Sequence, residues 1–464
     1  MIKSFFLMLL TGMVFFTGCK TLEPVGVQPL PLMIPGSFSA QTDGLEPVES
    51  WWYSFDSDEL NGLIEDALDN NFDLKSFKTK IDQAKASVSK ENAALFPELG
   101  FSLGGQKSGT QVKTAASSST YDDSHSWNGS LSGSYTADVW GEANAQIESG
   151  MSILRAAELD LKASTLDLTA QVAETWIDII AARNKKSILS HQIKNNQTLL
   201  ELQKLRFTHG KANALAVSQQ REALASASSQ VPLLEKQEQL SLNSLAFLSG
   251  KTMAEQIQMN TKILPDPVPL PGVGIPSDLL ENRPDIQAAK MRLSSSQWAI
   301  TAARADLLPS FSLTAQALFS SGTLDLLFNN WIATLAGSIA GPIFDGGFRK
   351  AEVERVKAVA QEQVNLYART VAKAIQEVED SLVSIEKQKD YIRLLEEELN
   401  VARLTLKDAM LQYQNGQSTY LSYLVAWTSI QRLERQLVGE RAGYIKERIG
   451  LYRALGWMPA PEMK

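Results

Sequence analysis

The chain carries very few histidines and cysteines, the side chains that most often bind transition metals or act as nucleophile and base in catalysis. It has 464 residues with 3 His and 1 Cys, and the histidines lie far apart, at His125, His191 and His209. A metal centre needs several such ligands at close spacing, and a disulfide needs a second Cys. No phosphate-binding loop, dinucleotide fingerprint or nucleophile elbow is present. We therefore expect no catalytic residue, no metal and no bound cofactor, and we predict that the protein is not an enzyme.

The composition describes a folded, acidic protein. Hydrophobic residues make up 44% of the chain, which is typical of globular proteins. The formal net charge is −8, and the basic residues form no blocks. Nucleic acids are bound by clusters of Lys and Arg, so we expect no nucleic-acid partner.

The single cysteine lies in a context that indicates covalent lipid attachment. Lys3 precedes a short apolar run, and Thr17 and Gly18 come directly before Cys19. A basic start, a short apolar core and small residues before a cleavage point are typical of a secretory signal. Bacterial lipoprotein signals place the lipidated cysteine at this position. We predict a signal peptide over 1–18 and a diacylglycerol and N-acyl lipid on Cys19; the alternative is a plain signal peptide with an incidental cysteine.

The residue after the cysteine bears on the destination of the protein. Lys20 stands there, and not the Asp that tends to retain lipoproteins in the inner membrane of enteric bacteria. We therefore predict a protein anchored by lipid in the cell outer membrane, with a long periplasmic portion.

An internal repeat runs through the chain. Asn71–Leu74 recurs as Arg283–Ile286, and further landmarks follow in the same order in both halves. The further pairs are Leu95–Pro97 with Leu307–Pro309, Trp127 with Trp331, Gly141 with Gly347, Phe207 with Tyr413, Gly210 with Gly416, and Gly250 with Gly456. An unchanged order with small changes in length indicates duplication of one structural unit.

Each half contains two stretches of alternating apolar and small polar residues. In the first stretch Leu99, Phe101 and Leu103 alternate with Gly and Ser. We predict strands over about 98–105 and 127–139 in the first half, and over about 310–320 and 331–343 in the second. Strands that are apolar on one side and small and polar on the other suit a transmembrane β-barrel. The alternative is two soluble hairpins packed on a core.

Long helices follow the strands in both halves. No Gly or Pro occurs from Met151 to His209 or from Phe348 to Asn415, and apolar residues recur every seven positions, as in a supercoiled seam. Gly210 and Gly416 then permit tight reversals. We predict long helices over about 142–208 and 348–415, and return helices over 211–250 and 417–456.

These patterns give a predicted division of the chain. Its segments are a signal peptide 1–18, a lipidated linker 19–56, a first repeat 57–250, an equatorial linker 251–275 rich in Pro and Gly, a second repeat 276–456 and a C-terminal tail 457–464.

The strand count predicts an oligomer. About eight strands are needed to fill even a narrow barrel, and open sheet edges are not stable in lipid. Two copies would supply eight strands and three copies twelve; we predict three. The predicted fold class is mainly α with a membrane β-barrel, a duplicated strand–helix repeat. The trimer would form a 12-stranded β-barrel, with four strands from each chain, continuous with an α-helical coiled-coil periplasmic tunnel.

Several stretches resemble outer membrane factors, the TolC/OprM-like channels of tripartite efflux systems. The resemblance runs from about Trp51 to Trp457 and rests on a combination of motifs. These motifs are Trp51–Phe55, Val231–Leu234, Ile275–Leu280 leading into Arg283–Ile286, Ala305–Pro309 and Pro342–Gly347. Together with the lipobox, they look most similar to OprM-like lipoproteins of multidrug pumps.

The resemblance implies a function and a set of partners. It implies a homotrimer in outer membrane lipid that binds a periplasmic adaptor protein and an inner-membrane transporter of the resistance-nodulation-division type. Such a channel passively conducts small molecules, such as drugs and amphiphiles, across the outer membrane.

The resemblance also implies which residues meet the adaptor. They lie at the two reversals and are Phe207, Gly210 and Lys211 at the first and Tyr413, Gly416 and Gln417 at the second. The other interpretation of both glycines is a helix reversal without partner contact.

The resemblance further implies a periplasmic aperture just after the second reversal. OprM-like channels carry an aromatic–Leu pair there, followed by Asp-Ala-Gln-Arg. Here Tyr420 and Leu421 are present, but the next stretch reads Val425-Ala426-Trp427-Thr428, without the charged pair. We therefore predict an aperture at Leu421, Val425 and Thr428 that closes mainly by apolar packing.

Two other functions remain open on the sequence. A type I secretion duct for polypeptides would have the same fold, and a lipid-anchored periplasmic coiled-coil tether would need the helices but not the strands. The sequence does not indicate which molecules are transported, and metal export is neither supported nor excluded.

Overall fold

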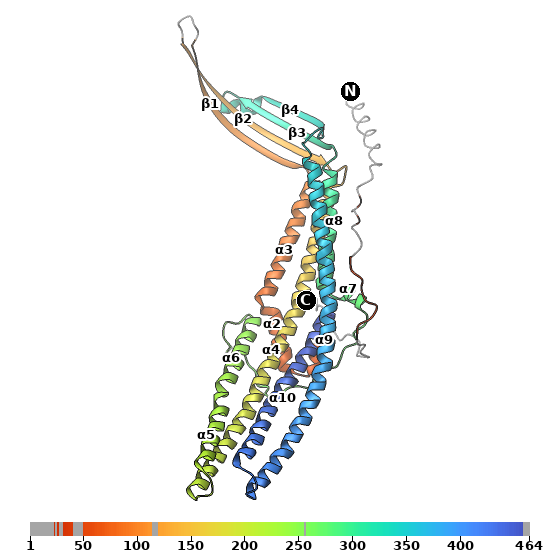
Figure 1. Ribbon diagram of the computed structural model, residues 1–464. Helices are drawn as coiled ribbons and strands as arrows, with labels where there is room; N and C mark the ends of the chain where they lie inside the picture. The colour runs from red at the N-terminus through yellow and green to blue at the C-terminus, as the bar shows by residue number, and fades with distance from the viewer. Residues whose placement is uncertain are drawn as a thin grey trace. The chain divides into compact units, whose positions relative to one another are not determined.

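The computed structural model describes residues 23, 26, 31–39, 50–113, 119–254 and 257–457 (Figure 1). The predicted signal peptide, Cys19 and the tail from residue 458 lie outside the described residues. The chain divides into two compact units. The first comprises Met1–Pro31, Lys80–Ala157 and Ala288–Ala368, and the second Leu32–Thr79, Glu158–Gln287 and Arg369–Lys464.

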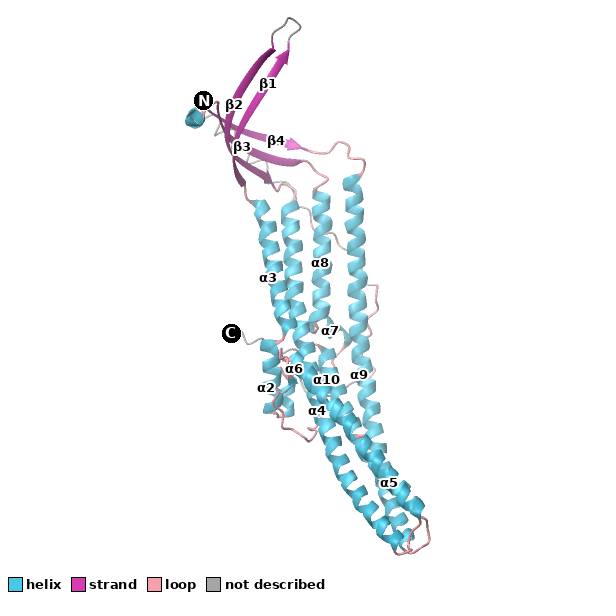
Figure 2. Ribbon diagram, turned by 90° about the vertical axis from the view of Figure 1, so that its left-hand side faces the viewer, coloured by secondary structure: helices cyan, strands magenta, loops and turns pink. Residues whose placement is uncertain are grey.

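The first unit contains one antiparallel sheet of four strands in the order β1-β2-β3-β4 (Figure 2). The strands are β1 (Glu98–Lys113), β2 (Ser119–Ala137), β3 (Ser310–Ser321) and β4 (Trp331–Ala340). Within the described residues, β1 and β4 each pair on one side only. The sheet therefore has two open edges.

The first two strands are longer than the sequence predicts. The sequence indicates strands over about 98–105 and 127–139, but β1 and β2 pair continuously from Glu98↔Ser134 to Lys113↔Ser119. The added residues are mostly Ser, Thr, Gly and Gln, which resemble a loop in composition, but they continue the antiparallel ladder that β1 and β2 already form in the sheet. The fourth strand ends at Ala340, before the predicted residue 343, because Gly341 and Pro342 follow and proline cannot donate to a ladder.

The register of the strands separates an apolar from a polar face. One row across the sheet is Phe101↔Leu131↔Ala317↔Ala333. On the other face, the row Gly100↔Ser132↔Gln316↔Thr334 is polar, whereas the row that starts with Ser102↔Ser130 ends with Leu318↔Ile332. Side chains alternate between the two faces of a strand, so these rows extend into an apolar face and a mainly polar face.

Four helices accompany the sheet in the first unit. They are parts of α3 (Phe72–Asn92), α4 (Glu142–Thr208), α8 (Pro284–Ala305) and α9 (Phe348–Gln414). Their contacts use small residues that allow close approach. A Cβ built on Gly150 of α4 would lie 3.3 Å from Val88 Cγ2 of α3. The Ser149 and Ser295 hydroxyls of α4 and α8 are 2.8 Å apart, and Ile300 of α8 packs on α9.

The second unit is all helical. It holds η2 (Trp51–Phe55), α2 (Asp58–Asn70), α5 (Ala214–Ser229), α6 (Val231–Leu248), η5 (Pro276–Asp278), α7 (Leu279–Asn282) and α10 (Tyr420–Leu455), with the remaining parts of the long helices. Among the residues that the structure describes, no helix has a stretch long and apolar enough to cross a membrane.

Both predicted return helices need correction. The sequence predicts one helix over 211–250, but the structure has α5 and α6 with a break at Gln230. Pro232 stands at the start of α6, where its missing N–H is tolerated, whereas it would interrupt a continuous helix. The second return helix, predicted from residue 417, begins at Tyr420 because the preceding residues form the turn.

The predicted linker over 19–56 also contains core residues. Trp51, Trp52 and Phe55 are buried, and the ring of Trp51 stacks on Tyr452 at 5.7 Å between centroids. Phe38 is buried as well. Burial of the large aromatic side chains at 51, 52 and 55 gives residues 50–56 a defined structure.

The repeat predicted from the sequence is visible in the contacts of the second unit. Asn71 donates from Nδ2 to the Leu248 carbonyl at 2.9 Å, and its counterpart Arg283 donates from Nη1 to the Ala454 carbonyl at 2.8 Å. Each accepting carbonyl stands two residues before a glycine with positive φ, Gly250 in one half and Gly456 in the other. The same backbone reversal is thus held by a side chain from the same position of each half.

Candidate functional site

The two tips of the second unit reverse the chain with the same hydrogen bonds. At the α4–α5 turn, Lys211 N donates to Arg206 O at 2.7 Å, and at the α9–α10 turn Gln417 N donates to Gln412 O at 2.8 Å. This bond between residues five apart is the Schellman motif, which needs a left-handed residue. Gly210 and Gly416 supply it, with φ of 66° and 71°.

The structure places the predicted tip residues in two environments. Phe207, Lys211 and Gln417 are exposed, and no described atom lies within 4 Å of a Cβ built on either glycine. Tyr413 is only half-exposed, because it lies against α4 and α10. Contact of these residues with an adaptor stays a prediction.

Tyr413 belongs to an aromatic cluster that joins α4, α9 and α10. Its ring lies 5.5 Å from Tyr420 and 6.2 Å from Tyr423, and the Arg206 guanidinium stands over it at 4.7 Å. Burial, together with the neighbouring rings of Tyr423 and Tyr413, raises the pKa of Tyr420 above its ordinary value. The Tyr420 hydroxyl therefore stays protonated and donates to Gln220 of α5.

A buried asparagine joins three helices above this cluster. Asn196 of α4 is fully buried, and its Oδ1 accepts from Trp427 Nε1 of α10 at 2.9 Å. Its backbone carbonyl accepts from Gln220 Nε2 of α5 at 2.9 Å, and its Nδ2 donates to Gln431 Oε1 of α10 at 3.3 Å. Together with Gln192 these residues form a polar network, which we call the Asn196 network.

Gln192 extends this network by one further helical turn. Its Nε2 donates to the Gln431 carbonyl at 3.1 Å and to Glu434 Oε2 at 3.2 Å, and its Oε1 accepts from Arg435. Sequence reasoning missed this network. Its signal is the helical spacing of Gln192, Asn196 and Gln203, which places three amides on the side of the helix that also carries Leu189 and Leu200.

The contact of α10 with α9 is different in kind. Its buried part is an aliphatic cluster formed by Leu395, Leu399, Ile430, Leu433 and Leu437. Half-buried polar pairs, such as Gln388 with Glu440, also join the two helices. The buried part of the contact with α9 is therefore aliphatic, whereas the contact with α4 contains buried amides.

The predicted aperture residues share one face of α10. Leu421, Val425 and Thr428 are exposed, while Tyr420 and Leu424 are buried. Positions spaced by four and three residues lie above one another on a helix. Arg432 continues this exposed row, and its Nη1 donates to Gln436 Oε1 at 2.9 Å. The sequence interpretation did not include this charge. That the row lines an aperture stays a prediction.

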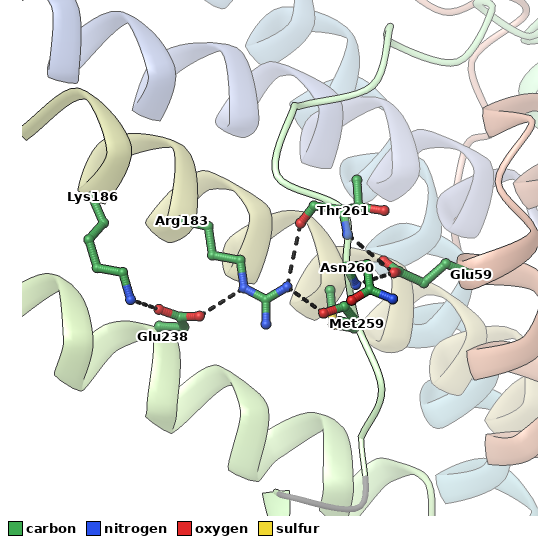
Figure 3. Close-up of polar contacts among 7 residues, drawn as sticks. All are labelled: Glu59, Arg183, Lys186, Glu238, Met259, Asn260 and Thr261. Carbon is green, nitrogen blue, oxygen red and sulfur yellow. Dashed lines mark hydrogen bonds and ion pairs between the residues drawn. The ribbon is translucent and has the colours of Figure 1, made fainter. Parts of the chain in front are cut away.

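The linker after α6 is fixed by charged side chains (Figure 3). Arg183 of α4 donates from Nη1 to the Met259 carbonyl at 3.0 Å and from Nε to Glu238 of α6 at 2.8 Å. Lys186 donates to the other oxygen of Glu238 at 2.6 Å. Burial alone would raise the pKa of Glu238, but the hydrogen bonds from Lys186 and Arg183 outweigh it and hold that pKa below its ordinary value.

A second carboxylate holds the opposite side of the same linker. Glu59 of α2 accepts from Asn260 N at 2.6 Å, from Thr261 N at 3.2 Å and from Trp176 Nε1 at 2.8 Å. Burial would raise the pKa of Glu59, but these hydrogen bonds lower it. Arg183 thus binds a backbone carbonyl of the linker, and Glu59 binds two of its backbone amides. Through these contacts and the Arg183–Glu238 pair, the linker connects α2, α4 and α6.

Known proteins match both halves of the chain. The model of the family described as "Outer membrane efflux protein" matches residues 63–251 and 275–457. The pyoverdine export outer membrane protein OpmQ of Pseudomonas aeruginosa is 31% identical over 455 residues, which cover 95% of each chain. The cation efflux system protein CusC of Escherichia coli is 27% identical and covers 95% of this chain and 96% of its own.

A solved structure agrees with these sequence matches. A crystal structure of CusC, from work on folding and transmembrane channel formation, has a TM-score of 0.84 and 27% identity and covers 94% of this chain and all of its own. The family model spans most of the chain, and the two matched stretches fall one in each half of the repeat. The chain therefore belongs to the outer membrane efflux protein family.

Proposed function

We propose that this chain forms, as a homotrimer, the outer membrane channel of a tripartite efflux pump. It passively conducts small molecules that a periplasmic adaptor and an inner-membrane transporter of the resistance-nodulation-division type deliver to it. The observation that carries this proposal is the sheet, which has one apolar face and two open edges in a chain of an outer membrane efflux family.

The open edges support the trimer. A strand edge in lipid leaves backbone N–H and C=O groups without partners, so spanning sheets are closed barrels. Pairing of β1 with β4 of another copy would satisfy both edges. Three copies then give twelve strands, enough for a water-filled interior.

The two kinds of seam on α10 support a mechanism for opening. Separation of the α9–α10 seam would expose aliphatic side chains to water, which is unfavourable in proportion to their area. Amides of the Asn196 network would exchange protein partners for water, at a net difference of about 1 kcal/mol for each hydrogen bond. The pair α9–α10 would therefore move as one body away from α4 and α5, which opens the aperture at Leu421, Val425 and Thr428.

The tips support docking of the adaptor. Phe207, Lys211 and Gln417 present one aromatic, one cationic and one amide side chain at exposed turns. A partner that binds both turns at once would bind the closed and open mouths differently, and only such a difference in affinity shifts a conformational equilibrium.

The proposal also covers the lipid on Cys19 and the molecules that the channel transports. Lipid on Cys19 would add a second attachment to the membrane besides the barrel. Relatives of this chain export pyoverdine or cations, as their names state. We propose that this channel likewise carries small molecules; this favours efflux over the type I secretion duct and over the tether.

Accumulation of a fluorescent amphiphilic dye in cells tests the proposal. Deletion of the gene should raise accumulation, and the wild-type gene should restore it, with a pump-poisoned culture as the upper limit. Gly416→Asp should fail to restore export, whereas Gly416→Asn, which has the same size without the charge and tolerates positive φ, should restore much of it. Unchanged accumulation in the deletion strain would contradict drug-type efflux.

A further inference from the structure

The loop between β3 and β4 is unusually apolar. It holds the short helix η6 (Leu324–Asn329), with the sequence Leu-Asp-Leu-Leu-Phe-Asn. Leu324, Leu326 and Phe328 are 55%, 46% and 70% exposed, whereas Leu327 between them is 1% exposed. Leu327 is therefore packed on all sides, whereas the three large apolar side chains around it are only partly covered by the described residues.

The position of Leu327 shows on which face of the sheet η6 lies. A Cβ built on Gly129 of β2 would be 4.0 Å from Leu327 Cδ2, 3.7 Å from Leu103 Cδ1 and 3.8 Å from Phe319 Cβ. Register places Leu103, Gly129, Phe319 and Trp331 in one row across the sheet. Leu327 thus fills the space left by the missing side chain of Gly129, on the apolar face.

Aromatic contacts agree with this placement. The ring of Phe328 lies 5.4 Å from that of Phe319, edge to face. Trp331, the next residue of the same row, is exposed. The loop therefore does not extend beyond the sheet but folds back over its apolar face, next to aromatic residues of the kind that form girdles at the borders of a membrane.

The neighbouring hairpin at the same end of the sheet is the opposite in character. Beyond Trp127, the last β2 residue paired with β3, the strands β1 and β2 continue as a two-stranded ribbon. Its described residues include Lys107, paired with Asp123 at 3.0 Å, and exposed Thr110. Polar side chains suit water, so the apolar character of η6 is not a general property of this end of the sheet.

We propose that η6 is a lipid anchor, in which Leu324, Leu326 and Phe328 insert among acyl chains of the membrane around the sheet. The occupant is lipid because these side chains continue the apolar face, which faces lipid in the proposed channel. The inference rests on that placement of the sheet. Gly129 and Leu327 hold η6 against the sheet, and the three exposed side chains would add apolar area at the border of the membrane.

Cysteine labelling in intact cells tests this anchor. A membrane-impermeant maleimide is applied to cells expressing Leu326→Cys, with Thr110→Cys of the polar ribbon and Leu335→Cys of the apolar face as matched controls. Labelling of the wild-type protein measures the background from Cys19. The expected result is fast labelling at position 110 and at least tenfold slower labelling at positions 326 and 335, with all three labelled after denaturation.

The controls separate failure of the anchor from failure of the function. Fast labelling at 326 with protection at 335 would overturn the anchor and leave the membrane sheet intact. Equal labelling at all three positions would overturn both, because the sheet would then not lie in a membrane.

A second measurement distinguishes lipid from protein cover. Full-length Leu326→Cys protein carrying a fluorescent label is placed in phosphatidylcholine vesicles, and the wild-type signal is subtracted. Phosphatidylcholine with a spin label near the headgroup should quench the fluorophore strongly, and addition of Gly129→Leu, which displaces Leu327, should reduce this quenching. Protection in cells without quenching by the spin-labelled lipid would show that protein covers η6, which overturns the proposal.

Discussion

Helix α10 is held on two sides by opposite kinds of contact. The buried part of its seam with α9 is built from leucines and an isoleucine. Its seam with α4 and α5 contains buried amides, an indole and a tyrosine hydroxyl, beside a small cluster of Ala216, Tyr420 and Leu424. Apolar contacts have no substitute in water, whereas hydrogen-bonding groups recover partners there. This difference indicates that α9 and α10 stay together when the mouth opens and that both separate from α4 and α5. Four predictions test it, from the largest expected effect to the smallest.

Truncation within the apolar seam should cost the most stability. Leu433 is fully buried, and Leu433→Ala should lower the free energy of unfolding by about 2–5 kcal/mol because it leaves a cavity between α9 and α10. Thermal melting of the trimer in detergent, followed by circular dichroism, measures this. Leu404→Ala, at an exposed position of α9, is the control. Equal melting temperatures for both variants would contradict the assignment of the apolar seam.

Loss of the central amide should open the channel more than it unfolds it. Asn196→Ala leaves the Trp427 indole N–H without its acceptor and Gln431 Oε1 without its donor, at a cost of about 1–3 kcal/mol to the closed arrangement. We expect higher conductance of the isolated channel in planar bilayers than for Leu433→Ala. Asn195→Ala, at the exposed neighbour, should behave as wild type. If the conductance of Asn196→Ala stayed at the wild-type value, the Asn196 network would not be what keeps the mouth closed.

The ion pairs of Glu238 with Arg183 and Lys186, next to the linker after α6, should affect stability but not conductance. Glu238→Gln weakens the contacts to Arg183 and Lys186 and should lower stability by about 1–2 kcal/mol, without a change in conductance. The pKa of Glu238 is lowered in the folded protein, so its contribution is present above the unfolded pKa of about 4.3 and is lost as pH falls through the folded pKa. Melting at neutral and strongly acidic pH should show the difference between wild type and variant disappearing in acid. A persistent difference would exclude the carboxylate as its source.

The aperture substitution should have the smallest effect on stability. Leu421 is exposed in the chain, so Leu421→Ser should change stability by less than about 0.5 kcal/mol. If three copies close the mouth by apolar packing, the variant should nevertheless raise single-channel conductance. Leu411→Ser of α9 is a matched exposed control. Unchanged conductance would remove Leu421 from the aperture.

The reversals and the duplication were predictable because glycine leaves a strong local signal. Gly210 and Gly416 end long runs without Gly or Pro, and the structure gives both of them positive φ. Landmarks such as Asn71 and Arg283 were found from sequence alone, and the structure adds that both hold equivalent backbone reversals.

The Asn196 network was not predictable in the same way. A glutamine or asparagine on a long helix usually faces water, and only packing of α10 and α5 around Asn196 makes it an interior residue. Tyr413 was placed at the tip for contact with a partner, but contacts with Gln203 and Arg206 of α4 hold it half-buried. Such contacts join residues far apart in sequence, which local patterns do not reveal.

The sheet shows the limits of composition. The ribbon beyond Trp127 is rich in Ser and Thr, a composition typical of a loop, whereas its backbone pairs as strands. The helix η6 lies between two predicted strands, and its local sequence does not indicate that Leu327 packs over Gly129 of β2, a contact between residues far apart in the chain.

A reversible cross-link across the polar seam tests the central claim most directly. Asn196→Cys with Gln431→Cys would allow a thiol-reactive bifunctional reagent with reducible disulfide links to join α4 to α10, and Gln388→Cys with Glu440→Cys would allow it to join α9 to α10; both replace hydrogen-bonded pairs. The account predicts that cross-linking of the first pair stops dye export until a reductant is added, and that cross-linking of the second leaves export unchanged. Continued export with α4 locked to α10, or export lost only with α9 locked to α10, would contradict it.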